Sequence, residues 1–229
     1  MKDISENTAS DLLANEVAEK IKKKIKYQEL KQGDRLTVSK LCKEFGTSET
    51  PVKQALNQLV TTGLVVAIPK CGMKVRTFTV QDMKDILEAR MMIESFCVKD
   101  VISNIRQSLE FAEILSDKLN KVNTTCEKCI TDLTRDSFYA SNDADSEFHD
   151  TIVQSCHNEQ IRAMYENMNT HAGMFSGFEV HTPDSMKIVI EEHTEMVNAL
   201  LQCNEERAIK AIEHHIYSTI QLYCYPVKN

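Results

Sequence analysis

An aspartate and a histidine stand four residues apart in the segment DADSEFHDTI, residues 143–152. In an α-helix, Asp145 and His149 share one face, where a carboxylate oxygen and an imidazole nitrogen could hold one metal ion. Mixed ligands of this kind suit Zn²⁺, Ni²⁺, Mn²⁺ or Fe²⁺. The spacing is also that of two polar residues on an ordinary helix, so the pair alone does not decide between a metal site and a solvated surface.

A second pattern with chemical potential is CEKC, in which two residues separate Cys126 from Cys129. This is the gap of a zinc or redox pair, but the chain has no second CxxC and no thioredoxin-like βαβ context. We therefore expect both residues to pack in the interior or to lie on the surface. The eight cysteines are scattered through apparent helices, which favours small buried hydrophobic residues over disulfides.

The composition is that of a folded, soluble protein, and its charge is divided unevenly along the chain. The 229 residues are 42% hydrophobic, enough for one large domain or two ordinary ones. No stretch is apolar enough to span a membrane and the N-terminus is too polar for a signal peptide, so we expect a cytoplasmic protein. Residues 1–80 carry 14 Lys and Arg against 9 Asp and Glu, whereas residues 81–229 carry 13 against 25. A basic first part suits contact with phosphates, and an acidic second part attracts cations.

The basic first part predicts a winged helix-turn-helix. Apolar residues at helical spacing predict a helix from Leu12 to about Tyr27, and KQGDRLTVSKLCKEFGTSETPVKQALNQLVTTGL, residues 31–64, predicts two short helices around a tight turn. Thr37 and Ser48 are the candidate N-caps. The segments LVVAI and MKVRTF, separated by a turn with Pro69 and Gly72, predict a β-hairpin.

The second short helix has one apolar and one polar face. Its inward stripe is Val52, Ala55, Leu56 and Leu59, which leaves Glu49, Thr50, Lys53, Gln54 and Asn57 facing outward. Outward side chains of these types can hydrogen-bond base edges or phosphates. Together with the hairpin and the local positive charge, they favour binding to double-stranded DNA.

From Val80 onward the chain reads as an all-α antiparallel bundle of about six or seven helices, so the fold class is mainly α. Segments with apolar residues at intervals of three or four lie near 81–102, 105–122, 127–140, 143–156, 158–175, 183–202 and 205–223. Thr182 and Pro183 suit the start of a helix. We place the domain boundary between residues 1–78 and 79–229.

Two segments resemble a known family of bacterial regulators. GDRLTVSKLCKEFGTSETPVKQALNQLVTTGLVVAIPKCGMKV, residues 33–75, resembles the winged-helix domain of GntR-type transcription regulators, and ILEARMMIE, residues 86–94, resembles the opening of the FCD (FadR C-terminal) effector domain, with Arg90 and Glu94 in the family's pattern. The resemblance covers Leu12 to Tyr223. It implies a cytoplasmic, homodimeric regulator, usually a repressor, whose helical domain binds a small molecule and thereby changes operator affinity.

The resemblance also indicates the DNA-contacting residues, with three departures. The family commonly has arginines where this chain has Ser39, Glu49 and Lys53. A carboxylate near phosphates repels them unless it accepts a hydrogen bond from a cytosine amino group. The expected DNA-contacting set is Ser39, Glu49, Thr50, Lys53, Gln54, Asn57 and the wing tip Lys70, Cys71 and Gly72.

In the helical part, the resemblance to the metal-binding version of the FCD domain implies four metal ligands: Asp145, His149, His193 and His215. Helix phase agrees with this set, because each of the four falls in line with the apolar stripe of its own segment. Unpaired buried polar groups cost on the order of 1–3 kcal/mol each, and one shared divalent ion would satisfy all four. The histidines His157, His171, His181 and His214 lack matching partners and are expected on the surface or in loops.

These observations predict a ligand-responsive DNA-binding regulator and not an enzyme. The family commonly senses carboxylated metabolites, and a bound metal could take the effector's carboxylate, with Arg90 as a second anchor. Two alternatives remain open. The metal ion itself could be the signal, or the protein could be a metalloenzyme with Glu147 or Glu192 as a base.

Overall fold

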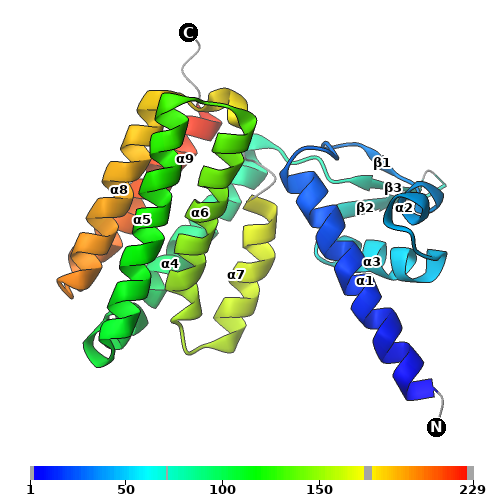
Figure 1. Ribbon diagram of the computed structural model, residues 1–229, viewed down its shortest axis with the longest axis horizontal. Helices are drawn as coiled ribbons and strands as arrows, with labels where there is room; N and C mark the ends of the chain where they lie inside the picture. Colours follow the sequence, from blue (N-terminus) through cyan, green and yellow to red (C-terminus); the bar gives the residue numbers. More distant parts are fainter. Residues whose placement is uncertain (1–2, 71, 173–176, 226–229) are drawn as a thin grey trace. The chain divides into compact units, whose positions relative to one another are not determined.

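The computed structural model describes residues 3–70, 72–172 and 177–225, and it describes side chains for all of these except 3–10 and 169–172. The chain divides into two compact units, Met1–Thr79 and Val80–Asn229, called here the N-terminal unit and the helical unit. Figure 1 shows the elements of each unit. The described part of the chain is mainly helical, as the sequence predicts.

The N-terminal unit packs three helices beside a small sheet. The helices are α1 (Asp3–Lys26), α2 (Val38–Phe45) and α3 (Glu49–Thr61), and the strands are β1 (Arg35–Leu36), β2 (Val65–Ile68) and β3 (Gly72–Val75). β3 lies between β1 and β2 and pairs antiparallel with both. The predicted helix pair and hairpin are present, so the unit is a winged helix-turn-helix. β1 was not predicted, because its two residues are too few to show an alternating pattern.

Turn residues separate the elements of this unit where the sequence predicted. Gly46 ends α2 in the left-handed region at φ 64°, and its N–H donates to the carbonyl of Cys42. Thr37 and Ser48 precede α2 and α3 in extended conformation, although neither side chain makes a capping hydrogen bond among the described residues. The predicted inward stripe of α3 is fully buried, with each of its four residues at most 1% exposed.

The helical unit consists, in its described residues, of six α-helices and one 3₁₀ turn. The helices are α4 (Val80–Gln107), α5 (Leu109–Thr131), α6 (Arg135–Gln154), α7 (Glu159–Ala172), α8 (Pro183–Leu201) and α9 (Glu205–Cys224), and the 3₁₀ turn η2 is Phe178–Val180. α4 packs on α9, α7 and α6, while α5 packs on α6 and α8, and α8 on α9. Figure 1 shows this arrangement as a bundle around a common interior.

Two predicted helix breaks in this unit were wrong. The segments near 105–122, 127–140 and 143–156 were expected to be three separate helices, but α5 runs unbroken through residues 123–126 and α6 through residues 141 and 142. The one break in this stretch lies between Thr131 and Arg135, where Thr134 and Ser137 form a reciprocal capping box that starts α6. Thr182 and Ser185 form the same motif at the start of α8, with Pro183 in its first turn as expected. No helix in the described part of the chain is long and apolar enough to cross a membrane.

Candidate metal centre

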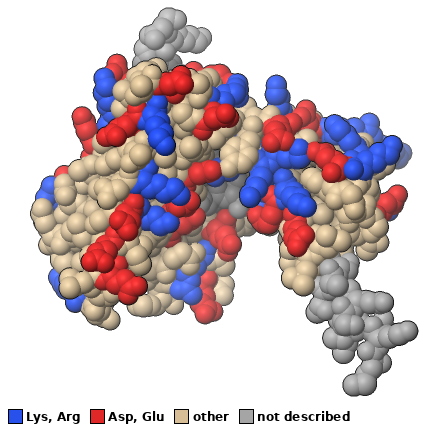
Figure 2. All heavy atoms as spheres, in the orientation of Figure 1, with Lys and Arg blue, Asp and Glu red and all other residues tan. Residues whose placement is uncertain are grey.

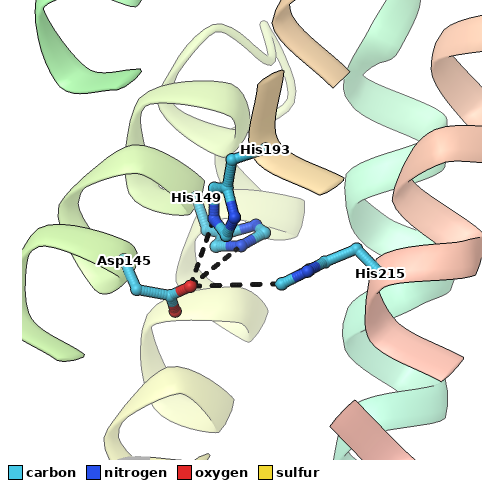
Figure 3. Close-up of side chains that lie close together, drawn as sticks. All are labelled: Asp145, His149, His193 and His215. Atoms are coloured by element: carbon cyan, nitrogen blue, oxygen red, sulfur yellow. Dashed lines mark ion pairs between the residues drawn. The ribbon is translucent and has the colours of Figure 1, made fainter. Parts of the chain in front are cut away.

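Three helices of the bundle bring Asp145, His149, His193 and His215 together. Asp145 and His149 lie on α6, His193 on α8 and His215 on α9. One ligand atom from each residue lies within 4.8 Å of those from the others, and no other such group occurs among the described residues. Figure 3 shows the three imidazole rings pointing toward the Asp145 carboxylate from different helices. The inward positions predicted by helix phase are therefore the observed ones.

The histidine Nε2 atoms converge on one carboxylate oxygen. Oδ1 of Asp145 lies 3.2 Å from Nε2 of His193, 3.7 Å from Nε2 of His149 and 4.0 Å from Nε2 of His215. His149 and His193 are completely buried and His215 is 5% exposed. Nε2 of His149 and of His193 have no hydrogen-bond partner among the described residues. Buried nitrogen atoms of this kind normally have a partner, so the donor set fits a metal ion.

The other ring nitrogen of each histidine faces an acceptor from the protein. Nδ1 of His149 lies 2.6 Å from Oε2 of Glu94, and Nδ1 of His215 lies 2.8 Å from Oε2 of Glu192. Nδ1 of His193 lies 2.9 Å from the Val189 carbonyl oxygen. Because a carbonyl or carboxylate oxygen only accepts, Nδ1 carries the proton when each ring is neutral, and Nε2 then presents its lone pair to the centre. This is the arrangement by which proteins orient histidine ligands of metals.

The residues around the cluster carry an excess of negative charge that favours a bound cation. Asp145, Glu94 and Glu192 contribute three carboxylates, while Arg90 contributes one guanidinium, which leaves an excess of two negative charges that a divalent ion would balance. Burial opposes ionisation of Glu94, but the charges of His149 and Arg90 outweigh it and lower the pKa of Glu94 to about 2. Burial likewise opposes ionisation of Asp145, yet His149 and His193 hold the pKa of Asp145 well below its usual range.

The surroundings of the cluster shift the pKa values of two of its histidines in opposite directions. Burial lowers the pKa of His215 to about 4, and the neighbouring His193 adds to that shift. Burial also favours neutral His149, but the carboxylates of Glu94 and Asp145 outweigh it and raise the pKa of His149. A proton on His149 thus partly offsets the excess negative charge when no metal ion is bound.

Arg90 lies beside the cluster with one donor unused. Its Nε donates to Oε1 of Glu94 at 2.7 Å, and the residue is 8% exposed. The Tyr165 hydroxyl donates to the same Glu94 oxygen at 3.2 Å. Nη2 of Arg90 is buried and has no acceptor among the described residues. A metal ion cannot accept a hydrogen bond, so this donor fits an oxygen atom of another ligand.

The predicted DNA-contacting residues of α3 fall on its exposed face with one exception. Glu49, Thr50, Lys53 and Asn57 are exposed, as are Ser39 on α2 and Lys70 and Gly72 at the wing turn. Gln54 is half-buried instead, and its amide lies 3.5 Å from Asp11 Oδ1 on α1. Lys70 and Gly72 both have positive φ, 64° and 87°, which shapes the tight wing turn. Cys71 lies outside the described residues.

Basic side chains gather on the N-terminal unit. Figure 2 shows, on the face in view, Lys and Arg side chains over the strands and α2 of this unit. The basic residues of these elements and of the wing turn are Arg35, Lys40, Lys43, Lys70 and Lys74. Such a surface favours contact with a phosphate backbone.

The remaining sequence candidates fall into two groups. Cys126 and Cys129 are completely buried on α5, and burial raises the pKa of the Cys126 thiol to about 11, so the pair is a packing feature as expected. His157 and His214 are exposed as expected. His181 lies in a loop as expected, but its side chain is half-buried and has partners that the sequence did not reveal. The side chain of His171 lies outside those described.

His181 illustrates what the sequence pattern missed. Its Nε2 lies 2.7 Å from the Tyr223 hydroxyl, and its ring packs against Phe138 at a centroid distance of 4.7 Å. Burial lowers the pKa of His181 to about 4. The role of Glu192 was also missed, because the sequence suggests a base there and the structure has its carboxylate hydrogen-bonded to His215.

Comparison with protein families identifies both units. The model described as "FCD domain" matches residues 85–218, which is more than half of the chain. The model described as "Bacterial regulatory proteins, gntR family" matches residues 13–75. The two matches fall within the helical unit and the N-terminal unit, respectively.

Individual relatives are similar over most of their length. An uncharacterized HTH-type transcriptional regulator, YdhC of Bacillus subtilis (strain 168), is 25% identical over 85% of this chain and 84% of its own. The HTH-type transcriptional repressor GlaR of Escherichia coli (strain K12) is 22% identical over 82% of this chain and 86% of its own. Among solved structures, E. coli McbR/YncC superposes with a TM-score of 0.78 at 21% identity, covering 92% of this chain and 97% of that one, which shows a shared fold.

Proposed function

Because the chain belongs to the GntR family of bacterial regulatory proteins and carries an FCD domain, we propose that it is a transcriptional repressor controlled by a small carboxylate and a bound metal ion. The repressor assignment is supported by relatives that bear this description, among them GlaR of E. coli. The observation that carries the effector proposal is the convergence of three histidine Nε2 atoms on Asp145 beside an unused donor of Arg90.

The proposed metal ligands are Asp145, His149, His193 and His215. Glu94, Glu192 and the Val189 carbonyl hold the imidazoles with Nε2 toward the centre. A divalent ion such as Zn²⁺, Ni²⁺, Mn²⁺ or Fe²⁺ bound there supplies a Lewis acid that attracts an oxygen ligand. The four residues and the local excess of negative charge hold such an ion without further protein groups.

The effector proposal depends on Arg90. Its Nη2 is buried next to the cluster and needs an acceptor, and a carboxylate oxygen forms the strong, charge-assisted hydrogen bond that a guanidinium favours. The Nε–Glu94 bond fixes the side chain in place before a ligand arrives. We therefore propose that the effector's carboxylate binds both Nη2 of Arg90 and the metal ion. Sugar acids, organic acids and amino acids are the classes to test.

Regulation follows from linkage between the two units. A ligand in the helical unit changes DNA affinity only by as much as it prefers one arrangement of the protein over another. The DNA contacts are proposed for Ser39, Glu49, Thr50, Lys53, Asn57, Lys70 and Gly72, with Gln54 at the edge that faces α1. A homodimer would place two such units on a palindromic operator. Light scattering of the purified full chain tests the dimer directly.

Calorimetric titration of the full chain with a panel of carboxylates tests the effector proposal. We expect at least one carboxylate to bind the metal-loaded protein and to bind about tenfold more weakly, or worse, after chelation and in the Arg90→Met variant. Arg106→Met is the matched control, because Arg106 is an exposed arginine on the same helix. Binding that is indifferent to both the chelator and Arg90→Met would contradict the proposal.

A regulator that senses the metal ion alone is the second candidate. It predicts operator affinity that follows metal concentration without any organic ligand. The unused Nη2 of Arg90 favours an organic effector, since a cation leaves that donor unsatisfied. A metalloenzyme has less support. Glu147 is paired with Lys118 and Lys121 on the surface, and Oε2 of Glu192 holds Nδ1 of His215, so both carboxylates have structural partners.

A further inference from the structure

The exposed face of α3 carries a paired acid and base where a DNA-binding surface is otherwise basic. Oε2 of Glu49 accepts a hydrogen bond from Nζ of Lys53 at 2.7 Å, and the two side chains are 64% and 58% exposed. Thr50 and Asn57 lie on the same exposed face. Glu49 is the first residue of α3, in the turn from which recognition helices contact base edges.

A carboxylate on this face weakens binding to phosphates, so any favourable contact of Glu49 with DNA must be to a base. Residues 1–80 have an excess of five positive charges, and these attract the DNA phosphate backbone without help from Glu49. The hydrogen bond from Lys53 lowers the pKa of Glu49, so Glu49 is ionised at neutral pH and acts only as an acceptor. In the major groove, the donors that an acceptor meets are the amino groups of cytosine and adenine.

The two side chains together match one base pair better than the others. Lysine only donates, and guanine presents two adjacent acceptors, N7 and O6, while its partner cytosine presents the N4 amino donor beside them. An A·T pair offers its acceptors singly on either side of the adenine amino group and adds the thymine methyl group. A donor and an acceptor fixed side by side on α3 therefore favour a G·C pair.

We propose that the Glu49–Lys53 pair reads one G·C base pair in each half of the operator, with Lys53 on guanine N7 and O6 and Glu49 on the cytosine N4 amino group. This inference rests on the proposed DNA-binding function and makes it specific. Glu49 then serves as a specificity-determining residue that discriminates against A·T at one position, at some cost in affinity for DNA of any sequence.

Selection from a library of randomised duplex DNA tests this inference without knowledge of the operator. The full chain is compared with Glu49→Gln. Glu206→Gln is the matched control, because Glu206 forms the same four-residue pair with Lys210, at 2.7 Å, on the exposed face of α9. We expect the motif selected by the wild type to contain a preferred G·C pair in each half. At that position the preference should disappear or shift toward A·T in Glu49→Gln, and it should persist in Glu206→Gln. Glutamine favours adenine, which gives the direction of that shift.

Affinity measurements on one selected duplex complete the test. Changing that G·C pair to A·T should weaken wild-type binding about tenfold and Glu49→Gln binding less than about twofold, while Glu49→Gln binds unrelated duplex DNA more tightly than wild type. An unchanged motif in Glu49→Gln, or dependence on Glu49 at an A·T position, would overturn the inference while DNA binding stands. Failure of the wild-type chain to enrich any motif would instead remove the DNA-binding proposal and this inference with it.

Discussion

Each of the three histidines around Asp145 uses one ring nitrogen for the protein and presents the other to the centre. Glu94, Glu192 and the Val189 carbonyl fix Nδ1 of the three rings, which leaves Nε2 of each ring facing the aspartate. Loss of such a partner typically lowers metal affinity about 10–100-fold. The site is thus a property of seven groups, of which four are proposed to touch the metal.

Helix phase was enough to predict that the four proposed ligands face inward, but it could not identify the residues that hydrogen-bond to them. Asp145 and His149 share an apolar stripe, and His193 and His215 lie on stripes of their own, so each could be oriented from local sequence. The acceptors come from other positions in the fold, with Glu94 standing 55 residues from His149. The partners of His181 were not found for the same reason, because Phe138 and Tyr223 are distant from it in sequence.

Substitution of Glu192 tests the role of these partners. We expect Glu192→Gln to weaken binding of a divalent ion about tenfold or more, because His215 loses a charged acceptor that raises its basicity. Competition with a coloured chelator measures the affinity. Glu191→Gln, one residue earlier and exposed, removes the same charge without touching a ligand and should leave the affinity unchanged. Equal affinities in the two variants would argue that Glu192 is only a packing residue.

At the scale of elements, helix starts were readable where a capping motif stood in the sequence. Thr182 and Pro183 marked the start of α8 correctly. The start of α6 was missed although Thr134 and Ser137 form the same box, because polar residues at 141–143 in the helix interior looked like a loop. Ser141 is in fact buried against the Cys126 thiol, so tertiary packing accounts for a polar residue inside the helix.

Removal of the α6 cap should destabilise the helical unit measurably. We expect Thr134→Ala to lower the free energy of unfolding by about 1 kcal/mol, because the Thr134 hydroxyl accepts from the Ser137 N–H. Chemical denaturation of the full chain followed by circular dichroism provides the measurement. Thr131→Ala is the control, since its hydroxyl bonds only to the Glu127 carbonyl inside α5 and its loss should cost less than about 0.5 kcal/mol. An equal loss in both variants would contradict a specific capping effect.

At the scale of the whole molecule, the unequal charge of residues 1–80 and 81–229 predicts two parts with different partners. The winged-helix architecture followed from two short helices with candidate N-cap residues and from a hairpin, and the bundle followed from repeated helical stripes. What the sequence could not supply was the choice of which stripes meet, since every inward stripe is mostly apolar and compatible with several neighbours. Resemblance to a family supplied that choice for the candidate metal centre.

Because the chain has two units, removal of the metal ion should destabilise only the helical unit that binds it. We expect chelation to lower the free energy of unfolding of the helical unit by about 2–4 kcal/mol, because the ion binds only the folded site. The N-terminal unit has its own core and should unfold unchanged. Scanning calorimetry with and without chelator measures both transitions. In Asp145→Asn the chelator should have little further effect, and an equal shift in that variant would point to a metal elsewhere.

The metal content of the purified full chain is the most direct test of the proposed sensor site. Elemental analysis of protein prepared without added metal should find about one divalent ion per chain, as expected for a site with four protein ligands. The ion should be lost in the double variant His193→Ala/His215→Ala and retained in His157→Ala/His214→Ala, which removes two exposed histidines. Equal metal content in wild type and in His193→Ala/His215→Ala, with both proteins folded, would contradict the metal centre and the effector site built upon it.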